Sequence, residues 1–272
     1  MEKTGRTTDS KLLFFTLPIT FLTMTCSLIG LFVPDFYWRE TADWQVQCLG
    51  QDLSNLLVVV PGLLVSACLA ARGSRSGKLI WIGLMAANCY DYAIYCFAVH
   101  FNPLFHLYCA IFGLSIYATI YFLIENQDNK HRFVCRVPEK TIGIFLIIVA
   151  SLFSVLWLLQ SLPAALADQV PAAVRNSGLP TNPVYVLDLS FFLPLMFISA
   201  VLLMKRHPLG YLLAPMMLIF AIVITINIVA LSVVDMHVTG SNQWPLIIGF
   251  GLMTMICAGF VRPLLRNRPE KA

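Results

Sequence analysis

The stretch KLIWIGLMAANCYDYAIYCFAV, residues 78–99, is long enough to cross a lipid bilayer as a helix, yet it contains the carboxylate of Asp91. A charge at that depth in a bilayer costs several kcal/mol. At helical spacing the polar side chains of this stretch fall on one face, which consists of Asn88, Asp91, Tyr92 and Tyr95. We expect this face to contact protein or water rather than lipid, and it is therefore a candidate binding surface.

The composition of the whole chain is that of an integral membrane protein. Hydrophobic residues make up 58% and charged residues 12% of the 272 residues, whereas about a quarter of the residues in soluble domains are charged. The mean hydropathy is +0.78. The sequence predicts an all-α fold, a polytopic bundle of eight transmembrane helices in a single integral membrane domain covering residues 1–272. The predicted spans are 12–33, 53–71, 78–99, 103–124, 141–160, 184–204, 208–233 and 245–262.

The basic residues indicate how this bundle is oriented. All 18 lie on the N-terminal, second-loop, fourth-loop, sixth-loop and C-terminal side, except Arg39 and Arg175. Because Lys and Arg accumulate in cytoplasmic loops, we expect a cell-membrane protein with both termini in the cytoplasm. The apolar run that ends at Val33 is too long for a signal peptide and is interpreted as an uncleaved first span. The net charge of +4 follows from these loops and does not support nucleic-acid binding.

The sequence contains two similar segments, which indicate an internal repeat. Asp-Leu-Ser occurs at residues 52–54 and 188–190, and each triplet precedes a proline inside a predicted span, Pro61 or Pro194. A duplication of four plus four helices about an axis along the membrane normal would explain this match. However, the first proline follows its triplet's aspartate by nine residues and the second by six, so a chance match is the alternative.

The acids inside the spans have no basic partner in sequence. No predicted span contains Lys or Arg away from its ends, so Asp91 and Asp188 must be protonated, hydrogen-bonded by neutral donors, or neutralised by a bound cation. Both lie in the outer half of the predicted bundle. Asn55 and Asn227 are predicted there too, and together these groups would form a polar cavity that faces outward. Asp52 and Asn102 are interpreted as helix caps.

Other arrangements of chemically active residues receive no support. The eight cysteines are scattered without a CxxC pair, and no metal site is predicted from His100, His106 and His237, because no metal-binding motif contains them. No serine lies in a nucleophile motif. The sequence therefore identifies neither a catalytic residue nor a cofactor.

Several segments resemble a family of uncharacterised prokaryotic multi-pass integral membrane proteins. They are NCYDYAIY at residues 88–95, FNPLF at 101–105, YVLDL at 185–189 with Pro194-Leu195, and LGYLLAP at 209–215. The resemblance extends from about the second span to the seventh. In that family Asn often occupies the position of Asp91, which implies that Asp188 is the more important acid. The resemblance implies a membrane protein but no activity.

Three hypotheses follow for function. The first is a transporter-like or solute-binding protein that holds a small solute and a proton or cation in the outward-facing cavity. Its ligand-binding residues would be Asp188, Asp91, Asn88, Tyr92, Tyr95 and Asn227. The second is a membrane-embedded enzyme that acts on a lipid or quinone, with a carboxylate as general acid or base. The third is a non-catalytic assembly subunit that binds a protein partner through its polar residues.

Overall fold

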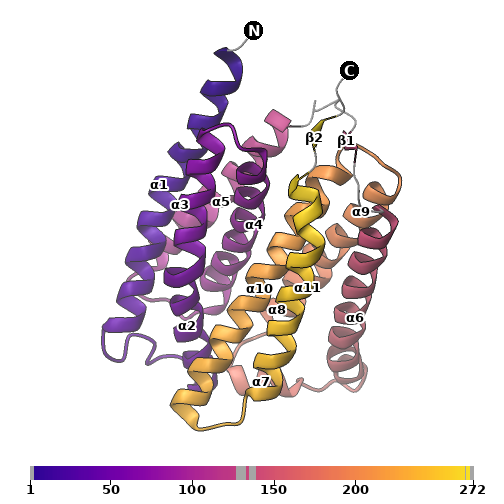
Figure 1. Cartoon of the computed structure of the whole chain (residues 1–272). Helices are drawn as coiled ribbons and strands as arrows, with labels where there is room; N and C mark the ends of the chain where they lie inside the picture. Colours follow the sequence, from indigo (N-terminus) through magenta and orange to yellow (C-terminus); the bar gives the residue numbers. More distant parts are fainter. Residues whose placement is uncertain (1–2, 127–132, 135–138, 267, 270–272) are drawn as a thin grey trace.

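The computed structural model shows a bundle of long helices that run side by side (Figure 1). It describes residues 3–126, 133–134, 139–266 and 268–269. The helices of the first part are α1 (Lys3–Phe32), α2 (Ala42–Ser54), α3 (Val60–Ala71), α4 (Arg75–Ala98) and α5 (Phe105–Asn126). Those of the second part are α6 (Glu139–Leu166), α7 (Ala172–Ser177), α8 (Pro183–Leu187), α9 (Leu193–Met204), α10 (Gly210–Thr239) and α11 (Trp244–Arg266). Two short strands, β1 (Phe133–Val134) and β2 (Arg268–Pro269), pair antiparallel.

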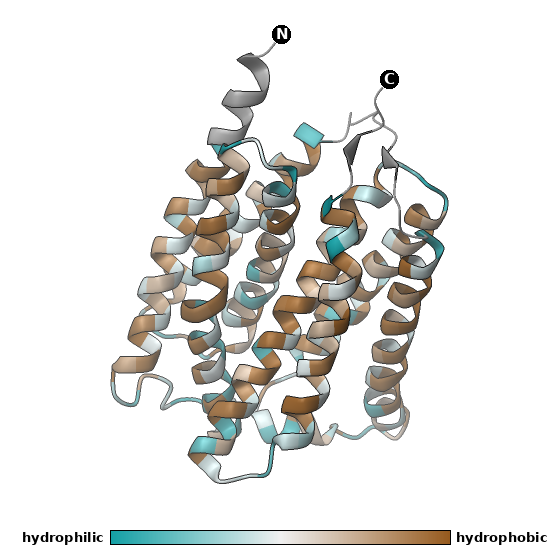
Figure 2. Ribbon diagram, viewed as in Figure 1, coloured by the Kyte–Doolittle hydropathy of each residue, from teal (hydrophilic) through white to brown (hydrophobic). Residues whose placement is uncertain are grey.

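The described residues include seven helices that are long and apolar enough to cross a membrane. Hydrophobic residues run along their length and hydrophilic residues gather at the two ends of the bundle (Figure 2). Large apolar side chains such as Phe14, Leu159 and Met255 are exposed on the outside, as lipid contact requires. The structure therefore supports a multi-pass membrane protein in a lipid bilayer.

Helix α4 runs alongside these seven over a similar length but is not one of them (Figure 1). It contains Asp91 and several other polar residues, which lower its mean hydropathy. Most of its 24 residues are buried, including Trp81 and Asn88. The bundle therefore encloses the polar face of α4, as we expected for a helix that cannot present that face to lipid.

The second membrane helix begins earlier than the sequence predicts. It covers Ala42–Ala71, not residues 53–71, and Thr41 caps its N-terminus by accepting a hydrogen bond from the Trp44 N–H at 3.3 Å. The interpretation of Asp52 as a helix cap is therefore wrong. The glutamines and aspartates of residues 43–52 look like a loop in sequence, but in the fold they face protein and an internal cavity rather than lipid.

This second membrane helix and its later counterpart each contain a wide turn just before a proline. Residues Asn55–Val59 and Asp188–Phe192 are π-helical, and they are followed by Pro61 and Pro194 as the second residues of α3 and α9. Because proline lacks an N–H and its ring collides with the preceding turn, a helix commonly widens or bends there. The two prolines are separated by 133 residues, as are the two π-helical segments.

The same spacing of 133 residues relates two helical hairpins. The Ser74 N–H bonds to the Leu69 carbonyl at 3.0 Å, and the His207 N–H bonds to the Leu202 carbonyl at 2.9 Å. The residue before each donor has a positive φ, 83° at Gly73 and 56° at Arg206. Both hairpins therefore turn in the same way between consecutive membrane helices.

Glycines allow close contact at equivalent places in these hairpins. Gly77 lies against the backbone of Leu69 and Ala70, and Gly210 lies against that of Leu202 and Leu203. A Cβ atom at either glycine would overlap those backbone atoms. With this spacing Asp188 corresponds to Asn55 and not to Asp52, so the two Asp-Leu-Ser triplets are one helical turn out of step.

The contacts between the two halves are not symmetric. Helix α10 packs closely on α2 and α4 in the centre of the bundle, whereas the corresponding contact of α4 with α8 is slight. The start of α1 and the end of α11 lie at the same end of the molecule, near the labels N and C (Figure 1). Helices α7 and α8 and the start of α2 lie at the opposite end.

Candidate functional site

A cavity of about 560 Å³ lies where the two halves are least tightly packed. Helices α2, α4 and α10 form one side of it, and α6, α8, α9 and α11 form the other. Asp43 and Gln160 lie near the end of the bundle opposite the chain termini, and Met253 and Cys257 line the deeper part. Most of its walls are apolar. Its volume is in the range of about 300–1,000 Å³ that is typical of small-molecule sites.

The charged side chains that line this cavity are all acidic. They are Asp43, Asp91, Asp188 and Asp235, and none of the described lining residues is Lys, Arg or His. Asp43 and Asp235 are near the mouth, where neutral groups hold them: Gln47 donates to Asp43 at 3.3 Å and Ser241 to Asp235 at 3.0 Å. The negative charge of the cavity is therefore not compensated by its own walls.

Asp91 lies on the α4 side of the cavity with only 2% of its surface exposed. The side-chain amide of Asn227 on α10 donates to both carboxylate oxygens, at 3.2 and 3.3 Å. The Asn227 oxygen in turn accepts a hydrogen bond of 2.5 Å from the Ser54 hydroxyl. Ser54 therefore orients the amide so that its N–H groups face the carboxylate.

Asp188 lies on the opposite side and is more open to the cavity. The indole N–H of Trp157 on α6 donates to its Oδ2 atom at 2.8 Å, and the Tyr90 side chain of α4 also interacts with it. Asp188 is the first residue of the second π-helical segment, so the widened turn positions it. The sequence placed Asp91 and Asp188 in one cavity, and the structure brings them to the same cavity with neutral hydrogen-bond donors.

Asp52 belongs to a separate, closed cluster that the sequence interpretation missed. It is 1% exposed and accepts hydrogen bonds from the Tyr37 hydroxyl at 2.6 Å and the Tyr95 hydroxyl at 2.8 Å. Burial, together with the Asp52 carboxylate, raises the pKa of Tyr37 well above its usual range. Tyr37 therefore remains a protonated donor at neutral pH. Its position in a loop of aromatic residues gave no periodic signal for this contact.

The polar face predicted on α4 is divided between two environments. Tyr95 lines the cavity as well as contacting Asp52. Asn88 instead donates to the Ser115 hydroxyl of α5 at 2.9 Å. Tyr92 stacks on the Tyr95 ring, with 5.3 Å between ring centroids. Asn88 and Tyr92 are not among the residues that line the cavity, so the structure does not bring these two to the other predicted ligand-binding residues.

The remaining predicted polar residues have local partners. Asn102 accepts a hydrogen bond from the Leu104 N–H at 2.9 Å just before α5, as a capping residue does. The His100 ring contacts the Glu40 carboxylate at 2.8 Å. Within the described residues no group of three or more His, Cys, Asp or Glu side chains could hold a metal ion.

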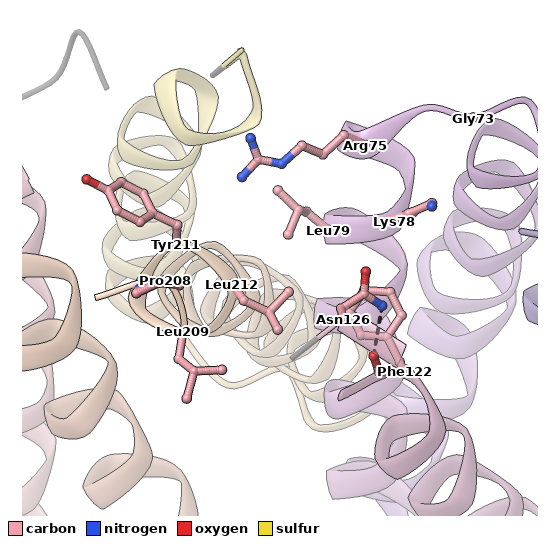
Figure 3. A pocket seen from close by; sticks show the side chains of 10 residues that line it. All are labelled: Gly73, Arg75, Lys78, Leu79, Phe122, Asn126, Pro208, Leu209, Tyr211 and Leu212. Atoms are coloured by element: carbon pink, nitrogen blue, oxygen red, sulfur yellow. Dashed lines mark hydrogen bonds between the residues drawn. The ribbon is translucent and has the colours of Figure 1, made fainter. Parts of the chain in front are cut away.

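A second, smaller pocket of about 200 Å³ lies near the start of α4 and the start of α10 (Figure 3). Arg75 and Lys78 line it together with Asn126 and Tyr211. Figure 3 shows the Arg75 and Lys78 side chains extending in opposite directions, so their charges do not converge on one position. The larger acidic cavity is therefore the better candidate site.

Comparisons of the chain with protein-family models, with curated proteins and with solved structures find no match. The chemistry of the site must therefore be inferred from its own residues. Two carboxylates with neutral donors, in a cavity with mostly apolar walls, are suited to bind a cation or a proton together with an apolar group.

Proposed function

We propose that this chain is a transporter-like, solute-binding protein of the cell membrane, with its solute in the acidic cavity and a proton or cation at Asp188 and Asp91. The observation that supports this most directly is that both acids line one cavity whose described walls contain no basic side chain. An acid in a membrane interior is costly unless something offsets its charge. A cationic or protonated partner offsets it here.

The proposed topology has eight spans, with α4 as the eighth, both termini in the cytoplasm and the cavity facing outward. The distribution of Lys and Arg supports this orientation, and the start of α1 and the end of α11 lie at the same end of the bundle. Reporter fusions at residues 130 and 175 should report opposite sides of the membrane. Fusions that report the same side would contradict this topology.

The proposed four-plus-four duplication rests on the spacing of 133 residues. It relates the prolines, the π-helical segments, the hairpin hydrogen bonds and the close-packed glycines. Duplicated transporters commonly place their sites between the repeats, near helices with interrupted backbone hydrogen bonding. Asp188 begins such an interruption and faces the cavity between the two halves.

Native mass spectrometry of the gently extracted protein tests solute binding. Ala221 lines the cavity on α10, so Ala221→Phe should fill part of the space. Ala110→Phe on α5 makes the same change at an exposed position and is the control. We expect wild type and Ala110→Phe to carry a bound small molecule and Ala221→Phe to lose it. No bound molecule in wild type, or equal retention in Ala221→Phe, would contradict the proposal.

The apolar walls of the cavity also favour a second function, an enzyme that acts on a lipid or quinone. In that case Asp188 or Asp91 would transfer a proton as general acid or base. The two functions differ in what happens to the bound molecule. A transporter-like protein in liposomes moves it unchanged, whereas an enzyme produces a molecule of different mass.

A further inference from the structure

We propose that the solute of this cavity is an organic cation, an ammonium-type group attached to an apolar body. This inference rests on the proposed solute-binding function and adds the chemical class of the ligand. It rests on the aromatic side chains that surround Asp188.

Four aromatic residues line the cavity near this carboxylate. Tyr90 packs edge-on against Phe192 and Phe220, with ring centroids 5.0 and 5.6 Å apart. Phe192 and Phe220 stack with centroids 4.3 Å apart and planes only 6° from parallel. Trp157 completes the set through its hydrogen bond to Asp188. We call Tyr90, Trp157, Phe192 and Phe220 the aromatic group.

The aromatic group comes from four separate segments of the chain. Tyr90 is on α4, Trp157 on α6, Phe192 at the end of the second π-helical segment and Phe220 on α10. Such rings are common in any apolar core, but here they surround a carboxylate that remains partly exposed to a cavity. The faces of aromatic rings attract cations, and organic ammonium groups bind in aromatic cages of this kind.

The same geometry disfavours a bare metal ion as the ligand. Calcium takes about 6–8 oxygen ligands and magnesium about six. Asp188 instead has an indole N–H, a phenol and aromatic rings as neighbours. An ammonium group with carbon substituents needs fewer oxygen atoms, because ring faces and one carboxylate can replace its water.

The rest of the cavity fits a cation with an apolar body. Asp43 and Asp235 near the mouth add negative charge that attracts cations and repels anions. Beyond the aromatic group the deeper walls are apolar and include Met196, Phe250 and Met253. A volume of about 560 Å³ accommodates a body much larger than an ammonium group alone.

Tetraphenylphosphonium and tetraphenylborate provide a direct test, because they have the same shape and opposite charge. We would measure their binding to the full-length protein in lipid nanodiscs by equilibrium dialysis, with empty nanodiscs subtracted. Wild type should bind the phosphonium at least tenfold more tightly than the borate. Asp188→Asn should weaken phosphonium binding about tenfold, and Phe220→Leu should weaken it about fivefold. Asp188→Glu keeps the charge and should keep the preference for the cation.

Asp35→Asn is the matched control, since it removes one exposed carboxylate outside the cavity and should bind like wild type. Equal binding of the two probes to wild type, or unchanged phosphonium binding in Asp188→Asn, would overturn the inference. If a co-purified molecule is displaced by Ala221→Phe while the phosphonium does not bind, the cation class is wrong and solute binding stands. If neither is observed, the proposed function fails as well.

Discussion

Asn55 and Asp188 occupy corresponding positions in the two halves of the molecule, but their surroundings differ. Each is the first residue of a π-helical segment that precedes a proline. Asn55 is fully buried, donates to the Ser27 hydroxyl of α1 at 3.3 Å and accepts from Gln51 at 3.0 Å. Asp188 is partly exposed to the cavity and accepts a hydrogen bond from Trp157 of α6.

The first half has a closed interior, whereas the second half is open. In the first half, tyrosine hydroxyls from a loop and from α4 satisfy Asp52, and stacked rings of Tyr92, Tyr95 and Tyr108 fill the space around it. In the second half, the slight contact between α4 and α8 leaves a cavity. The difference indicates that buried polar groups are structural in the first half and available to a ligand in the second.

The largest expected difference between the halves is the effect of removing each acid on stability. Asp52→Leu leaves the Tyr37 and Tyr95 hydroxyls buried without an acceptor, which should cost about 2–5 kcal/mol. Asp188→Leu affects groups that face the cavity and should cost about 1 kcal/mol. Unfolding midpoints of the detergent-solubilised variants measure both effects.

Asp52→Asn is the control for shape, because it retains one acceptor oxygen and should be less destabilising than Asp52→Leu. The comparison between the halves fails if the leucine variants at residues 52 and 188 lose equal stability.

A smaller effect tests the similarity of the halves. Gly77→Ala and Gly210→Ala each place a Cβ atom against the backbone of the preceding helix and should each cost about 1–3 kcal/mol. Gly113→Ala on α5 is the control, since nothing lies within 4 Å of its added Cβ atom. Unfolding midpoints should fall for both hairpin variants and not for the control. A neutral result at only one hairpin would break the proposed correspondence.

The smallest effect concerns Tyr37 and alkaline pH. Its pKa is raised in the folded state by burial and by Asp52, so the folded protein retains this proton at a pH where the unfolded chain loses it. This contribution to stability is therefore complete below a pH of about 10 and is lost as the pH rises above that value. Tyr37→Phe should cost about 1 kcal/mol at pH 7 and reduce the loss between pH 10 and 11. Identical slopes for the two proteins would show that Tyr37 is not the titrating group.

The sequence was sufficient to predict the apolar helices and the importance of Asp91 and Asp188, because intramembrane acids without basic partners are conspicuous. It was misleading for Asp52, since the polar residues at the start of the second membrane helix resemble a loop when their protein surroundings are unknown. It also paired Asp52 with Asp188 through a short triplet. The correspondence with Asn55 depends on hairpin hydrogen bonds and on π-helical turns, which leave no simple pattern in the residues.

Cysteine accessibility at the two corresponding positions tests the central claim most directly. Asp188→Cys and Asn55→Cys would be made in a background without the eight native cysteines and treated from outside with a membrane-impermeant thiol reagent. We predict rapid modification of Asp188→Cys, which faces the open cavity, and no modification of Asn55→Cys, which is enclosed. Equal modification of both, or modification of Asn55→Cys alone, would contradict an open second half and a closed first half.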